Sequence, residues 1–82
     1  MDENKYQNAL VTVERQLYAW ENALPEKLLD PDTMRDVIKI VYYESRFLRK
    51  RAEYDLNRLN VLEENGVFDC YYAERESAGF YD

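Results

Sequence analysis

The first 24 residues carry apolar side chains at alternating steps of four and three residues, which is the spacing of a heptad seam. Such a stripe lies on one side of an α-helix and has to be buried against other elements. Proline follows the stripe at Pro25, and its missing N–H group cannot continue a helix. The pattern therefore predicts a first amphipathic helix over about 3–24. Its seam consists of Tyr6, Leu10, Val13, Leu17, Trp20 and Leu24.

A second helical segment has clear start and stop signals. Asp30 is a suitable N-cap, Pro31 suits the first helical position, and Gly66 is a natural left-handed C-cap. No glycine or proline lies between them, so the sequence predicts one helix over about 31–65. It would be roughly 50 Å long, against roughly 33 Å for the first helix. The expected fold is all-α, an antiparallel helical hairpin of two long amphipathic helices in a single domain 1–82.

The remaining residues, 67–82, form an acidic, tyrosine-containing tail. Val67 and Phe68 are expected to fold back onto the last turn of the second helix, as the hydrophobic contact of a C-cap motif does. Residues 69–77 have the composition of a short C-terminal helix. The end of the chain from Gly79 is expected to fray.

The predicted second helix carries two apolar lines, and one partner helix cannot cover both. The second line consists of Ile40, Tyr43, Phe47, Tyr54 and Val61. Either the C-terminal segment or another subunit covers it, and the unequal helix lengths favour another subunit. A chain of 82 residues with one cysteine and no histidine has no internal disulfide or zinc site to stabilise a thin core. We therefore expect a helical-bundle homo-oligomer, with a homodimer as the first interpretation.

Charge is distributed unevenly along the chain. The net charge is −6, yet residues 31–60 hold seven basic and five acidic side chains. A basic run over 46–51 either contacts an acidic or phosphate-bearing partner or pairs with the chain's own acids, most directly those of the tail. The acidic tail either solubilises the chain or imitates a nucleic-acid strand. Its carboxylates are Glu63, Glu64, Asp69, Glu74 and Glu76.

Several classes of function are disfavoured by composition. Without histidine the chain lacks the usual acid–base group, and its two glycines cannot form a phosphate-binding loop. Cys70 lies among acidic residues that disfavour a thiolate. We expect no catalytic residue, no cofactor and no metal, and hence no enzyme. No stretch approaches the roughly 20 apolar residues of a membrane span, so we expect a cytoplasmic protein with no membrane contact.

These observations favour a non-enzymatic protein–protein interaction protein. Its general character is that of small accessory proteins of phages and mobile elements, such as anti-CRISPR inhibitors, so the expected role is an inhibitor or adaptor that binds a host or defence protein. The alternatives are a nucleotide or nucleic-acid binder using the basic run, which the acidic net charge disfavours, and a structural subunit of a larger assembly. The expected partner-binding residues are Tyr43, Phe47, Tyr54, Arg46, Arg49, Lys50 and Arg51.

Overall fold

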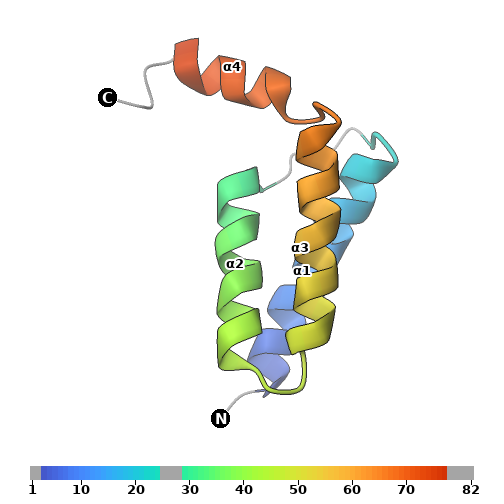
Figure 1. The fold of residues 1–82 in the computed structure, drawn as a ribbon, viewed down its shortest axis with the longest axis vertical. Helices are drawn as coiled ribbons and strands as arrows, with labels where there is room; N and C mark the ends of the chain where they lie inside the picture. The colour runs from blue at the N-terminus through green and yellow to red at the C-terminus, as the bar shows by residue number, and fades with distance from the viewer. Residues whose placement is uncertain (1–2, 25–28, 78–82) are drawn as a thin grey trace.

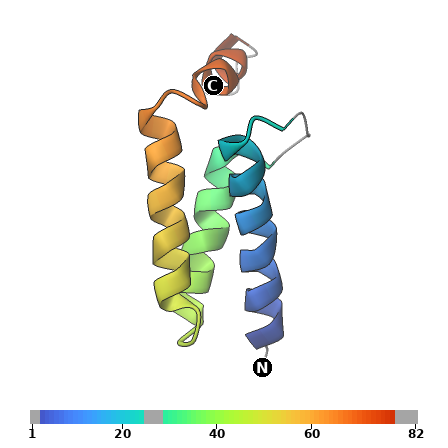
Figure 2. The ribbon, with the colours of Figure 1, turned by 90° about the vertical axis from the view of Figure 1, so that its right-hand side faces the viewer.

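The computed structural model describes residues 3–24 and 29–77. This part of the chain contains four helices and no strand, which confirms the all-α fold class. Three helices lie side by side and alternate in direction, and the fourth crosses one end of them (Figures 1 and 2). The helices are α1 (Glu3–Glu21), α2 (Pro31–Glu44), α3 (Arg49–Glu64) and α4 (Asp69–Ser77).

The single helix predicted over 31–65 is wrong, because the chain reverses at Ser45 to Leu48 and α3 runs back antiparallel to α2. Ser45 adopts an extended backbone, with φ −118° and ψ 117°. Its fully buried hydroxyl donates to Glu3 Oε2 at 3.0 Å and accepts the Leu48 N–H at 3.3 Å. The turn contains neither glycine nor proline, so no local signal revealed it. The expected hairpin of two long helices is therefore replaced by a three-helix bundle.

The reversal removes the length mismatch on which the oligomer prediction partly rested. In a continuous helix, the end from about Tyr54 to Glu64 would extend beyond anything that α1 could cover. In the structure, Ala52 and Leu59 of α3 are fully buried against α1 and α2. The free energy gained by burying these side chains, about 1.5–3 kcal/mol for each large one, offsets the helical hydrogen bonds that the turn breaks.

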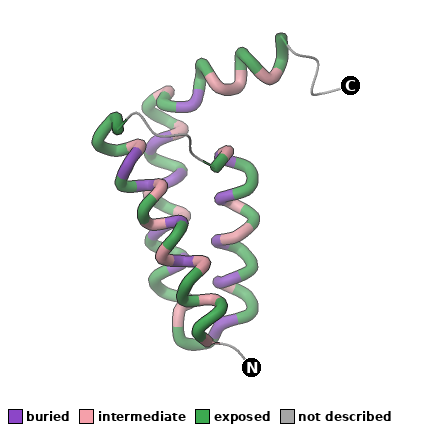
Figure 3. Tube along the Cα trace, turned by 180° about the vertical axis from the view of Figure 1, so that it is seen from behind, coloured by how far each residue is buried: buried purple, intermediate pink, exposed green. Residues whose placement is uncertain are grey.

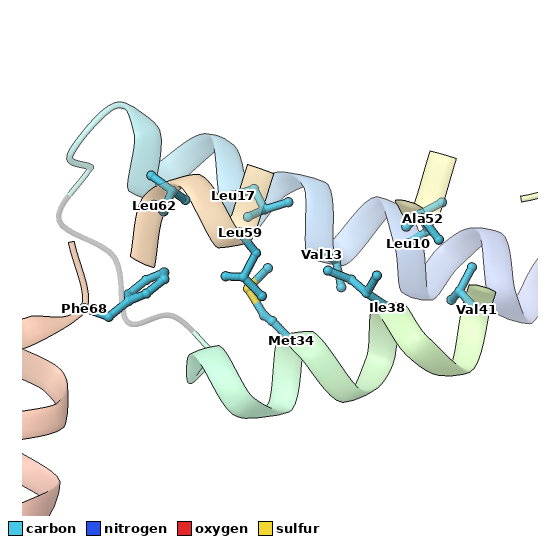
Figure 4. Close-up of a cluster of buried hydrophobic side chains, with 10 residues drawn as sticks. All are labelled: Leu10, Val13, Leu17, Met34, Ile38, Val41, Ala52, Leu59, Leu62 and Phe68. Atoms are coloured by element: carbon cyan, nitrogen blue, oxygen red, sulfur yellow. The ribbon is translucent and has the colours of Figure 1, made fainter. Parts of the chain in front are cut away.

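The core lies along the axis of the bundle and takes residues from all three long helices (Figures 3 and 4). The centre of the predicted α1 seam is confirmed as part of it, whereas Tyr6 and Trp20 are only partly buried and Leu24 is 43% exposed. The buried cluster consists of Leu10, Val13, Leu17, Met34, Ile38, Val41, Ala52, Leu59, Leu62 and Phe68.

Most predicted helix ends are confirmed. The Asp30 carboxylate accepts the Thr33 N–H at 2.7 Å and so caps α2. Gly66 has φ +78° after α3, and the Val67 N–H bonds to Leu62 O in a Schellman turn. Helix α1 ends at Glu21 rather than Leu24, because Ala23 takes the left-handed conformation there. Pro25 and residues 78–82 of the predicted tail lie outside the described residues.

Helix α4 has the bounds predicted for the short C-terminal helix, and side-chain contacts hold it across the end of the bundle. Phe68, at its start, is buried edge-on against Trp20, with ring centroids 4.7 Å apart. Tyr72 donates its hydroxyl to Glu63 Oε2 at 2.8 Å, and Arg75 pairs with Asp32 at 2.5 Å. Among the described helices, none is long and apolar enough to cross a membrane.

Ile38 and Ile40 of α2 provide a matched test of this packing, because they are 0% and 53% exposed. Ile38→Ala is expected to lower the free energy of unfolding by about 2–5 kcal/mol, since it leaves a cavity in the core. Ile40→Ala is expected to change it by less than about 0.5 kcal/mol. Urea denaturation followed by circular dichroism measures both values. Equal losses would contradict the bundle and would indicate that Ile40 is buried by another element.

Candidate functional site

The second apolar line is exposed in the structure. Phe47 is 80% exposed, Tyr43 72% and Tyr54 64%. Helix α4 crosses the end of the bundle opposite the turn between α2 and α3, which contains Phe47 (Figure 1). Ile40 and Val61 are exposed as well, so within the described residues the C-terminal segment does not cover this line. Aromatic side chains with this much surface in water are common anchors of protein interfaces.

The turn between α2 and α3 brings four of the predicted partner-binding residues together at one end of the molecule. We call Tyr43, Arg46, Phe47 and Arg49 the basic tip. Arg49 is held in place, because its Nε donates to Tyr42 O at 3.2 Å and its guanidinium lies 5.8 Å from the centre of the Tyr42 ring. Arg46 forms no ion pair with any described residue.

The other predicted partner-binding residues are elsewhere. Lys50 and Tyr54 lie on the solvent-facing side of α3. Arg51 points toward α1 and donates two hydrogen bonds to the Glu14 carboxylate, at 2.6 and 2.5 Å. The basic run is continuous in sequence, but the structure divides it between the basic tip, the solvent-facing side of α3 and the contact with α1.

The predicted acidic residues lie at the opposite end of the bundle from the basic tip, on the last turn of α3 and on α4. The described part of the tail therefore does not pair with the basic run. The Glu63 carboxylate already has partners, because it accepts a hydrogen bond from the Tyr72 hydroxyl and forms an ion pair with Arg35. The other four carboxylates are exposed: Glu64, Asp69, Glu74 and Glu76.

A buried acid, which sequence reasoning missed, lies between α1 and α3. Asp55 is 0% exposed, and only one of its two carboxylate oxygens, Oδ1, has a hydrogen-bond donor, which is Arg58 at 3.3 Å. The other oxygen, Oδ2, is buried without a donor, while the carboxylate of Glu14 interacts with Asp55 from α1. If Asp55 is protonated, its carboxyl group can donate a hydrogen bond to the Glu14 carboxylate, and the two acids no longer repel each other.

The pKa shifts of Asp55 and Glu14 agree with a proton that Asp55 holds and donates to Glu14. Burial, followed by the hydrogen bond and the charge of Glu14, raises the pKa of Asp55 from 3.8 to about 7. Burial alone would raise the pKa of Glu14 too, but hydrogen bonds from Arg51 and Asp55 outweigh it and lower that pKa. The burial of Asp55 could have been predicted from the sequence. Asp55 lies three residues after Ala52 and four before Leu59, so it falls on the apolar face of the helix.

Asp55 is sealed from solvent, so it acts on the stability of the bundle rather than on a substrate. A surface hollow of about 510 Å³ lies along α3 and is bordered by Glu21 at the end of α1. Glu21 and Arg58 pair across this hollow, and Tyr54 and Val61 form its apolar wall. Within the described ranges, no three His, Cys, Asp or Glu side chains are grouped to hold a metal ion.

Comparisons with protein-family models, with curated proteins and with solved structures found no match for this chain.

The raised pKa of Asp55 predicts a pH-dependent stability. The folded chain keeps this proton up to about pH 7, whereas the unfolded chain loses it near pH 3.8. The free energy of unfolding should therefore fall as the pH rises through this window, by roughly 2–3 kcal/mol between pH 5 and pH 8. Asp55→Asn keeps the shape and the neutral charge, so it should remove most of this slope and stabilise the chain at pH 8.

Urea denaturation at several pH values measures the slope for the native chain and for the variant. Asp36→Asn is the matched control, because Asp36 is an exposed aspartate of α2 and its removal should leave the slope unchanged. Parallel pH profiles for the native chain and Asp55→Asn would show that Asp55 is ionised in the bundle.

Proposed function

We propose that this chain is a non-enzymatic binding protein, an adaptor or inhibitor, which recognises another protein through the basic tip. The observation that carries the proposal is the exposure of Phe47 and Tyr43 beside an arginine, Arg46, that has no ionic partner among the described residues. Aromatic rings and arginine are the residue types that dominate binding energy at protein interfaces.

The position of the tip supports this role. Phe47 lies in a turn and contributes nothing to the buried cluster, so its exposed ring has no structural purpose in the isolated chain. The turn is supported by Ser45, whose hydroxyl bonds to both Glu3 and the Leu48 backbone. A turn whose backbone is already fixed loses little backbone entropy on binding.

The chemistry of the tip indicates the kind of partner. Phe47 and Tyr43 require an apolar pocket, and Arg46 and Arg49 require carboxylates near its rim. An acidic protein surface with a hydrophobic cleft meets both requirements. The alternative partner, nucleic acid, is less well supported, because Glu14 engages Arg51 and only part of the basic run remains available for phosphates.

The proposal predicts which substitutions abolish binding. Phe47→Ala and Arg46→Glu should each weaken capture of the partner from the native cell at least about tenfold, which corresponds to about 1.4 kcal/mol. Tyr18→Ala and Arg15→Glu are the matched controls, because both residues are exposed on α1 away from the tip, and these variants should bind normally. Capture by the tagged chain and its four variants, quantified by mass spectrometry, measures the effect.

A partner that binds all five proteins equally would contradict the proposal. A salt titration with single-stranded DNA tests the alternative. Tight binding at low salt that weakens steeply as salt is added would favour a nucleic-acid binder instead.

A further inference from the structure

The solvent-facing side of α3 carries an ordered stripe of five exposed residues. They are Lys50, Tyr54, Asn57, Val61 and Glu64, which we call the outer stripe. The steps between them are four, three, four and three residues, so they lie in one line along the helix. The opposite side of α3 holds Ala52, Leu59 and Leu62 and faces the core. Helix α3 thus packs one apolar face against its own bundle and presents a second seam, the outer stripe, to solvent.

The middle of the outer stripe is apolar. Tyr54 is 64% exposed and Val61 52%, and both line the hollow of about 510 Å³ beside α1. The Arg58 guanidinium lies 5.9 Å from the centre of the Tyr54 ring, which holds this ring over the hollow. Asn57 lies between the two apolar residues. A single polar residue within such a seam is the usual means of fixing register between paired helices.

The ends of the outer stripe are charged in an unfavourable order for an isolated helix. Lys50 lies in the first turn of α3, at the positive end of the helix dipole, and Glu64 is the last residue, at the negative end. Neither residue forms an ion pair with any described part of the chain. Both charges would be stabilised by an opposite charge placed beside them from outside.

A second copy of the same stripe supplies those charges when it runs in the opposite direction. We propose that α3 pairs antiparallel with α3 of a second copy of this chain, in a dimer with twofold symmetry. Lys50 then lies at the end that holds the partner's Glu64, and Glu64 lies beside the partner's Lys50. Tyr54 and Val61 bury their exposed surface between the two helices. The contact is isologous, since both copies use the same residues.

The same charges disfavour the parallel arrangement, because it would place Lys50 against the partner's Lys50. Helix α4 does not compete for the stripe, since it runs from the end of α3 across the start of α2, where Arg75 meets Asp32 (Figures 1 and 2). A contact centred on one pair of 16-residue helices is smaller than a standard interface, so dimerisation should require micromolar concentrations.

Charge exchange tests this pairing on the purified full chain. Lys50→Glu and Glu64→Lys should each raise the dimer dissociation constant about tenfold or more, because each places two like-charged pairs in the contact. The double variant carrying both changes should recover the native value, since its opposite charges are merely exchanged. An equimolar mixture of the two single variants should form a heterodimer in preference to either homodimer. Sedimentation equilibrium measures all of these constants.

Lys5→Glu on α1 and Glu76→Lys on α4 are matched controls, since both residues are exposed and lie off the outer stripe. These variants should dimerise like the native chain, and circular dichroism should show that all variants remain folded. Three results would overturn the proposal: a native chain that stays monomeric up to the highest soluble concentration, a double variant no better than the single ones, or controls that weaken the dimer equally.

Discussion

The reversal at Ser45 is the constraint on which the rest of the structure depends. A buried serine hydroxyl bonded to Glu3 at the start of α1 ties the turn to the far end of the sequence. Once the chain turns there, α3 lies against both α1 and α2. The ion pairs between α1 and α3, Arg51 with Glu14 and Arg58 with Glu21, exist only because of this reversal. The position of α4 depends on the same reversal, because Phe68, which directly precedes α4, packs on Trp20.

The buried carboxyl of Asp55 weakens the same interface at neutral pH. An apolar residue there would avoid the cost of desolvating an acid, which is several kcal/mol for an unpaired charge. The bundle lowers that cost by holding Asp55 as a neutral acid against Glu14 and by placing Arg58 on its other oxygen. Because Glu14 lies on α1 whereas Asp55 and Arg58 lie on α3, this cluster links the two helices.

The two surfaces that we assign to binding occupy different parts of the molecule. The basic tip lies at the turn between α2 and α3, and the outer stripe runs along α3. In an antiparallel dimer, the two tips would point to opposite ends of the assembly. Such an assembly would present its partner with two separated binding sites, and a partner with repeated sites would gain affinity from simultaneous contact.

Local patterns in the sequence predicted which segments are helical and several of the helix ends, but they joined α2 and α3 into one helix. Asp30 and Pro31 at the start of α2, Gly66 after α3, and the bounds of α4 all follow from short-range preferences that act within a few residues. The centre of the α1 seam also identified part of the core correctly, because helical periodicity alone decides which residues share a face.

Only the tertiary structure decided that 31–65 is two helices rather than one. Ser45 carries no breaking signal of its own, and its extended backbone is stabilised by the contact with Glu3, 42 residues earlier. The same holds for the basic run, which is one patch in sequence but is divided in space by the ion pair of Arg51 with Glu14. The sequence alone determined which helix faces are apolar and several of the helix ends. Long-range burial and ion pairing determined where the chain reverses and which of those faces stay exposed.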